Sequence, residues 1–213
     1  MQLDFHSHYP MNNSIVCTAQ PESFESKALL CCQGLLPNFW TEEKQTMLYE
    51  NLSTNPKLHM GEIGLDARYE SIISLKKQLE IFKSNLDFAL EHKLIVSLHC
   101  VRRIGAMQEL ICSSKYKALK YIWHGYNGSI ETAKQLSKFN ILLSIGLRYK
   151  GDIKALYQAT PKIVLETDYE GSSAIEHDNL LSSHYNNIAS CLGISLTNLE
   201  NHCSSLYQGL INN

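Results

Sequence analysis

Residues 58–99 read LHMGEIGLDARYESIISLKKQLEIFKSNLDFALEHKLIVSLH and contain the clearest structural pattern of the chain. The apolar runs Leu58 to Leu65 and Leu94 to His99 have the length and composition of buried strands. Between them, from about Ser71 to His92, apolar residues recur every three or four positions, which predicts an amphipathic helix. The recurring residues are Ile72, Leu75, Leu79, Phe82, Leu86 and Ala89. A strand, a helix and a strand in this order predict a parallel pair with a right-handed crossover.

The same alternation continues in both directions along the chain. Strands are expected at Gln2 to His8, Ser14 to Ala19, Leu29 to Leu35, Leu58 to Leu65, Leu94 to His99, Leu119 to His124, Ile141 to Ile145 and Ile163 to Asp168. Further helices are expected near 41–52, 102–113, 129–139, 151–158, 173–191 and 196–211. Eight such units predict an α/β fold, a compact (β/α)8 TIM barrel, with an open doubly wound sheet as the alternative.

The first two expected strands are separated by five residues, which is too few for a helix. We therefore expect the barrel to lack the outer helix between its first and second strands. The whole chain, 1–213, is predicted to form a single domain, since no repeat, linker or low-complexity tract divides it. This length is below the roughly 250 residues of a typical barrel, which predicts short loops and an open mouth.

Composition excludes several classes of protein. With 44% hydrophobic residues, 19% charged residues and a net charge of -2, the chain does not resemble a protein that coats nucleic acid non-specifically. No run approaches the roughly 20 apolar residues that span a bilayer, and no N-terminal stretch has the pattern of a signal peptide. The seven cysteines include no C-x-x-C spacing, so reduced thiols and a cytoplasmic location are expected.

Polar residues that could bind metal close or nearly close several of the expected strands. They are His6, His8, Glu62, His99, His124 and Asp168. In Asp4-Phe5-His6-Ser7-His8 the two histidines are two residues apart, so both imidazoles point to one face of a strand. Barrel enzymes build their sites at the carboxyl ends of the strands. Buried carboxylates and imidazoles without partners cost several kcal/mol, and two divalent cations would compensate that cost.

The expected arrangement has His6, His8 and Asp168 on one ion, His99 and His124 on the other, and Glu62 between them. Mg, Mn and Zn all suit this donor set, which does not select one. Asp168 and Glu62 are the expected catalytic residues, with Asp168 orienting or deprotonating a water. In the competing interpretations, Asp168 only caps a helix and Glu62 is an ordinary strand-end carboxylate. Glycines at 61 and 64 indicate a close approach of backbone or ligand.

Five ordered motifs resemble one known family. They are D-x-H-x-H at 4–8, G-E-I-G-L-D at 61–66, Leu98-His99, the run HGYNGS at 124–129 and Glu166-Thr167-Asp168. Together with Gln78 and Phe82 they resemble the TatD family of metal-dependent deoxyribonucleases, a branch of the amidohydrolase-like barrels. The resemblance implies two divalent cations and hydrolysis of phosphodiester bonds in DNA, often from the 3′ end. DNA is accordingly the expected partner, as single strands or 3′ ends, and the open mouth suggests a protein partner that completes it.

Several positions depart from that family's pattern. Leu36 stands where the family usually has histidine, Val101 takes the place of an arginine, and Tyr169-Glu170 replaces Ala-Pro. Substrate contacts are therefore unknown, although Arg102 and Arg103 could clamp a phosphate. The helix start after Gly125 could also bind one. Two alternative functions remain at this point: hydrolysis of a small amide, ester or lactone, or a subunit of a larger nucleic-acid-processing assembly.

Overall fold

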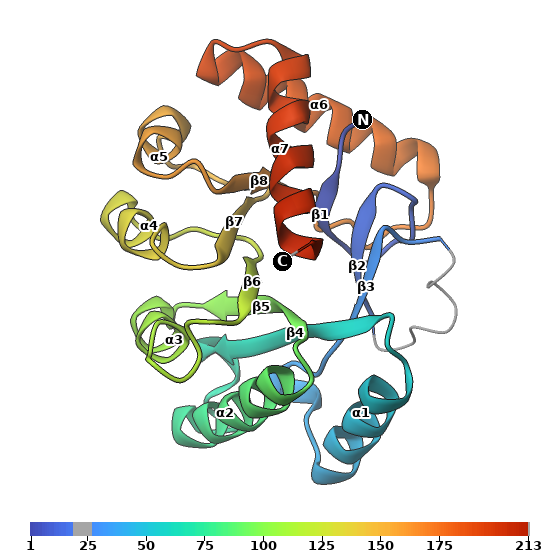
Figure 1. The fold of residues 1–213 in the computed structure, drawn as a ribbon, viewed down its shortest axis with the longest axis vertical. Coiled ribbons are helices and arrows are strands. Elements are labelled where there is room, and N and C mark those ends of the chain that lie inside the picture. The colour runs from blue at the N-terminus through green and yellow to red at the C-terminus, as the bar shows by residue number, and fades with distance from the viewer. Residues whose placement is uncertain (19–26, 213) are drawn as a thin grey trace.

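The computed structural model describes residues 1–18 and 27–212, and within them eight parallel strands follow one another in the order of the sequence. The strands are β1 (Asp4–Ser7), β2 (Ser14–Thr18), β3 (Leu30–Gln33), β4 (Leu58–Asp66), β5 (Ile95–Val101), β6 (Lys120–Trp123), β7 (Ile141–Ile145) and β8 (Ile163–Leu165). Figure 1 shows them arranged around a common centre. The predicted barrel is confirmed.

The ring closes between β1 and the segment that follows β8. The amide of Asp168 donates to the carbonyl oxygen of His6 at 3.0 Å, and the amide of His8 donates to Tyr169 O at 2.9 Å. The buried Asp4 carboxylate reinforces this seam, because its Oδ1 accepts the amides of His6 at 3.1 Å and Thr167 at 3.0 Å. Backbone pairing with β1 therefore holds two candidate ligands, His6 and Asp168, against each other.

Helices surround the strands in the described part of the chain (Figure 1). They are α1 (Glu42–Thr54), α2 (Leu75–Glu91), α3 (Ile104–Ile111), α4 (Ile130–Leu136), α5 (Ile153–Ala159), α6 (Ala174–Leu192) and α7 (Leu196–Ile211), with single 3-10 turns η2 (Pro37–Phe39) and η3 (Ala67–Tyr69). No helix lies between β1 and β2, where residues 8–13 form a turn, as predicted. Within the described residues, no helix is long and apolar enough to cross a membrane.

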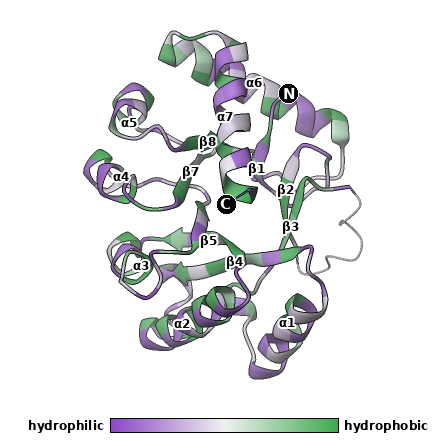
Figure 2. Cartoon of the chain, in the orientation of Figure 1, coloured by the Kyte–Doolittle hydropathy of each residue, from purple (hydrophilic) through white to green (hydrophobic). Residues whose placement is uncertain are grey.

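The helix α2 is amphipathic, as its sequence predicts. Figure 2 shows hydrophobic and hydrophilic bands alternating along it, and its buried residues include Ile81, Phe82 and Leu86. It begins later than predicted, however, because the hydroxyl of Ser74 accepts the amide of Lys77 and caps the helix there. The prediction that Ile72 belongs to the buried stripe was wrong: this residue precedes the helix and is 74% exposed.

Two glycines allow β4 and β5 to approach closely. A Cβ on Gly61 would lie 2.6 Å from the Cβ of Ser97, and one on Gly64 would overlap the carbonyl oxygen of His99. Both positions also have positive φ angles, 147° and 155°, which side chains disfavour. The close approach predicted from these glycines is therefore one of backbone, and it brings Glu62 on β4 next to His99 on β5.

Candidate metal centre

All six candidate ligands meet at the carboxyl end of the barrel. His6 lies on β1, Glu62 on β4 and His99 on β5. The other three follow strand ends: His8 after β1, His124 after β6 and Asp168 after β8. Glu62 is the centre of the cluster, with its Oε1 at 3.1 Å from His99 Nδ1 and 3.1 Å from His124 Nε2.

On the other side of the cluster, His6 connects Glu62 to Asp168. The Nε2 atom of His6 is 3.8 Å from Glu62 Oε1 and 3.8 Å from Asp168 Oδ1. The Nε2 atom of His8 is 3.7 Å from the same Asp168 oxygen. Two groups of three therefore have ligand atoms close enough to hold an ion, His6 with Glu62 and His124, and His6 with His8 and Asp168. His6 belongs to both groups, whereas the sequence suggested it for one ion only.

Three of the histidines are oriented through the ring nitrogen that faces away from the cluster. His8 Nδ1 lies 2.8 Å from the carbonyl oxygen of Cys17. His99 Nε2 lies 2.9 Å from Asp66 Oδ2, and His124 Nδ1 lies 3.0 Å from Glu166 Oε1. Histidines that bind metals usually donate one N–H to a carboxylate or carbonyl and turn the other nitrogen to the ion. The pattern fits a metal-binding role for all three.

His6 differs from these three because neither of its ring nitrogens has a hydrogen-bond partner although the residue is fully buried. A buried polar group left unpaired costs about 1–3 kcal/mol. Burial, together with the neighbouring His124, also holds the pKa of His6 well below its ordinary value. A neutral imidazole with an available nitrogen is the form that binds a cation, so the residue fits a ligand better than a structural role.

The carboxylates around the cluster create a strong negative field. Burial lowers the pKa of His124, but the facing Glu166 and Glu62 outweigh it and raise the value to about 10. Burial likewise raises the pKa of Glu62, yet His6, His124 and His99 shift it well below normal. For Asp168 burial prevails, and its pKa is raised. Glu62 and Glu166 face opposite nitrogens of His124, so positive charge is favoured between them, which suits divalent cations with oxygen and nitrogen donors nearby.

A cavity of about 850 Å³ opens above the cluster, lined by Glu62, His99, His124 and Asp168 among others. Two arginines also line it. Arg148, whose side chain is 88% exposed, donates from Nη2 to Asp168 Oδ2 at 2.7 Å. Arg68 pairs with the buried Asp66, Nη2 to Oδ2, at 2.5 Å. Among the described residues, these are the two arginines that line this cavity, and both could contact an anionic substrate there.

The arginines suggested by the sequence have other positions. Arg103 forms a bidentate ion pair with Glu70, at 2.5 and 2.7 Å, and neither Arg102 nor Arg103 is among the described residues that line the cavity. Backbone amides between Gly125 and the first turn of α4 also have hydrogen-bond partners within the protein. Ser129 caps α4 by accepting the amide of Thr132 at 3.1 Å, and the amide of Gly125 donates to Glu166 Oε1 at 2.8 Å.

Sequence reasoning gave no role to Glu166, Arg68 or Arg148 and little weight to Asp66. The positions of Asp66 and Glu166 could have been noticed in the sequence. Both are carboxylates near the end of a strand, and each lies within four residues of a candidate ligand, Glu62 or Asp168. Arg148 follows β7 in the same way, but an arginine after a strand is common at solvated surfaces. Its position beside Asp168 depends on how the loops fold over the barrel.

Comparisons with known proteins agree with the fold. A family model described as TatD related DNase matches residues 10–212. The fold resembles a hydrolase TatD family protein from Entamoeba histolytica, with 15% identity, a TM-score of 0.75 and coverage of 92% of this chain and 83% of that one. It also resembles the TatD homologue YJJV from Escherichia coli K12, with 17% identity, a TM-score of 0.73 and coverage of 94% and 86%.

A third similar structure is an uncharacterized amidohydrolase from Saccharomyces cerevisiae, with 12% identity, a TM-score of 0.70 and coverage of 93% of this chain and 88% of that one. No protein with a curated description matches the chain. The architecture is that of the TatD-type hydrolase barrels. The family match spans nearly the whole sequence, and the chain belongs to the TatD-related DNase family.

Proposed function

We propose that this protein is a metal-dependent phosphodiesterase that hydrolyses DNA, releasing nucleotides from the 3′ end with the help of two divalent cations. The observation that carries the proposal is the convergence of His6, His8, Glu62, His99, His124 and Asp168 within one cluster. Family membership supports hydrolysis as the reaction class. The two arginines at the mouth support an anionic substrate.

The residues are assigned to the cations by their positions. His6, His8 and Asp168 would hold one ion, and Glu62 and His124 the other, with His6 between them and His99 next to Glu62. Mg, Mn and Zn remain the candidates. When bound, such cations polarise a phosphoryl oxygen and lower the pKa of a water. Asp66, Glu166 and the Cys17 carbonyl keep the imidazoles of His99, His124 and His8 in orientation.

Asp168 is the proposed proton acceptor for the attacking water. Its Oδ1 lies 3.8 Å from His6 Nε2 and 3.7 Å from His8 Nε2, so the carboxylate stands at the cluster where the water would lose its proton. Arg148 contacts the other carboxylate oxygen and extends into the mouth, where its guanidinium can bind the phosphate that is cleaved. Glu62 remains ionised, because the surrounding histidines lower its pKa, and supplies negative charge for the cations.

The experiment is an assay on end-labelled single-stranded oligonucleotides with Mg²⁺, Mn²⁺ or Zn²⁺. We expect stepwise release of nucleotides from the 3′ end by the wild-type protein, and loss of that release in His6→Ala. The matched control is His92→Ala, since His92 is an exposed histidine that contacts Phe88 on α2 and lies outside the cluster. Cleavage of small amides, esters or lactones with no release of nucleotides would overturn the proposal.

A further inference from the structure

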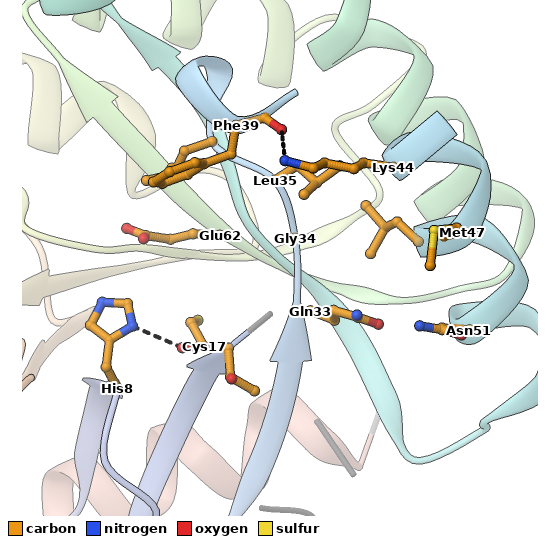
Figure 3. Close-up of a pocket in the computed structure, with 13 residues that line it drawn as sticks. His8, Cys17, Gln33, Gly34, Leu35, Phe39, Lys44, Met47, Asn51 and Glu62 are labelled. Atoms are coloured by element: carbon orange, nitrogen blue, oxygen red, sulfur yellow. Dashed lines mark hydrogen bonds between the residues drawn. The ribbon is translucent and has the colours of Figure 1, made fainter. Parts of the chain in front are cut away.

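A second cavity, of about 620 Å³, lies beside the metal cluster and extends toward α1 (Figure 3). His8 and Glu62 form one side of it, so it adjoins two of the candidate ligands. The remaining walls come from the ends of β2 and β3, the segment that contains η2, and one face of α1. The volume lies in the range of about 300–1,000 Å³ typical of small-molecule sites.

The walls of this cavity are largely apolar. Leu35, Leu36, Phe39, Met47 and Leu48 line it together with Cys17. Two of these side chains are exposed to an unusual degree for their type, since Phe39 is 57% and Met47 is 56% exposed. A ligand in the cavity would cover both and remove apolar surface from water, which is favourable. The exposed face of Phe39 is also a surface on which a flat ring can stack.

Polar side chains are present at defined places in the same cavity. Figure 3 shows Gln33 and Asn51 on the side away from His8 and Glu62, with their amide groups turned toward each other. Thr18 adds a hydroxyl group. Lys44, on α1, donates to the carbonyl oxygen of Phe39 at 3.2 Å and so connects the helix to the segment that carries the ring. These side chains make part of the cavity wall polar, and a purely aliphatic ligand would exclude water from them without offering a polar edge in its place.

We propose that this cavity binds the base of the nucleotide whose phosphate lies at the metal cluster. The proposal rests on the proposed function. A nucleobase has two apolar faces for Phe39, Leu36 and Met47, and a polar edge for amide groups such as Gln33 and Asn51. An acyl chain would match the apolar walls but not the amides, so an uncharged heteroaromatic ring is the better fit. Phe39 and Asn51 are thereby assigned as residues that determine specificity.

The test uses nucleosides, which lack the phosphate and therefore need no cation. Thymidine and adenosine are titrated into chelator-treated protein, and binding is measured by isothermal titration calorimetry. We expect saturable binding to the wild-type protein, weakened about tenfold in Phe39→Ala through loss of stacking and also weakened in Asn51→Leu. The matched control is Ile72→Ala, because Ile72 is an exposed apolar residue that lines neither cavity.

A kinetic arm compares thymidine 5′-(4-nitrophenyl) phosphate with methyl 4-nitrophenyl phosphate. Met47→Trp, at an exposed helix position, fills the cavity and should lower the ratio of the two kcat/KM values about tenfold. An unchanged ratio in Met47→Trp would overturn the base pocket. Octanoate is the probe for an acyl chain, and a protein that binds octanoate but not nucleosides would overturn it as well. Failure of nucleosides to bind while DNA is hydrolysed rejects the base pocket alone. Nucleoside binding without DNA hydrolysis supports the pocket and rejects the proposed function.

Discussion

The two ends of the barrel use similar side chains for different purposes. At the carboxyl ends of the strands, histidine nitrogens face carboxylates such as Glu62, and a large cavity opens to solvent. At the amino ends, α7 lies across the barrel, as Figure 1 shows. There His202 Nε2 lies 3.1 Å from the carbonyl oxygen of Ile163, and Lys120 Nζ donates to Leu210 O at 2.8 Å. Charged side chains therefore gather at the carboxyl end of the barrel. At the amino end, polar side chains form hydrogen bonds with backbone carbonyl groups instead.

This difference shows that a histidine's partner says more about its role than its burial does. The same contrast is found within the carboxyl end: His6 and His184 are both buried, yet His184 Nε2 lies 2.8 Å from the carbonyl oxygen of Ile145, the last residue of β7, whereas neither ring nitrogen of His6 has a hydrogen-bond partner. An imidazole with a hydrogen-bond partner stabilises the fold. A buried imidazole without one, next to carboxylates, destabilises the cation-free protein, and binding of a cation would remove that cost. Substitutions at the two ends should therefore separate loss of activity from loss of stability.

The largest effect is expected at the carboxyl end, in Asp168→Asn. The change preserves the shape of the side chain but removes its charge and its capacity to accept a proton. We expect turnover of end-labelled single-stranded DNA to fall by about 10²- to 10⁴-fold. The free energy of unfolding, measured in urea, should change little because the residue lies at the rim. Near-normal turnover would contradict the role given to Asp168.

The opposite outcome is expected at the amino end, in Tyr207→Ala. The ring of Tyr207 packs edge-on against Phe5, with centroids 6.4 Å apart, and its hydroxyl donates to Leu29 O at 3.3 Å. Removing a buried aromatic ring costs about 3 kcal/mol of unfolding free energy, whereas Tyr207→Phe, the matched control, should cost about 1 kcal/mol. Turnover per folded molecule should not change in either variant. A specific loss of turnover would show that the two ends are not independent.

A third test concerns pH and His59, at the start of β4. Its Nδ1 accepts the amide of Ile95 at 3.2 Å, and burial, with Lys120 nearby, lowers its pKa to about 4. The unfolded chain binds this proton near pH 6.5, so between pH 6.5 and 4 the unfolded state holds more protons and stability falls as pH falls. The expected loss, discounted for partial exposure, is about 2 kcal/mol.

His59→Asn is the informative variant for that test, since Asn keeps an acceptor for the Ile95 amide but does not titrate. Urea unfolding of the wild type and the variant is measured at several values between pH 4 and 7. The difference in unfolding free energy between the two proteins should shift with pH in favour of the variant as acid is added. A difference that is constant with pH would remove His59 as a source of acid sensitivity.

The smallest effect is expected for Arg148→Ala. Its guanidinium is exposed and its link to Asp168 is a surface ion pair, which contributes little to stability. Loss of one charge-assisted contact to a phosphate should raise KM for an oligonucleotide about tenfold. Steady-state kinetics measure this change. Arg102→Ala is the control, because Arg102 is exposed but lines neither cavity. An equal rise of KM in both variants would show that the net charge of the protein, and not a contact made by Arg148, determines the effect.

The strand order and the convergence of the site follow from local patterns. Apolar runs ending in His99 or His124 predict both the strands and the rim at which the side chains meet. The sequence predicts too early a start for α2 because Ile72 continues the apolar period, whereas the capping hydroxyl of Ser74 sets the first helical residue at Leu75. The structure ends β8 at Leu165, three residues before the predicted end at Asp168, and the positive φ of 54° at Asp168 is a conformation that a strand does not have.

Contacts between residues of different loops could not be predicted from the sequence. Arg103 was a reasonable candidate for a phosphate contact, but its partner Glu70 lies in another loop, and only the folded chain brings the two together. The role of Glu166 as the partner of His124 depends in the same way on the register between β7 and β8. Periodicity identifies which faces are buried, whereas pairing between separate loops requires tertiary structure.

The most direct test of the metal centre is calorimetric titration of chelator-treated protein with Mn²⁺, comparing the wild type with His6→Ala. Because His6 belongs to both groups of ligands, we predict two saturable ions per wild-type chain and a loss of binding at both sites in the variant. Equal stoichiometry and affinity in the two proteins, or no saturable binding by the wild type, would contradict the account.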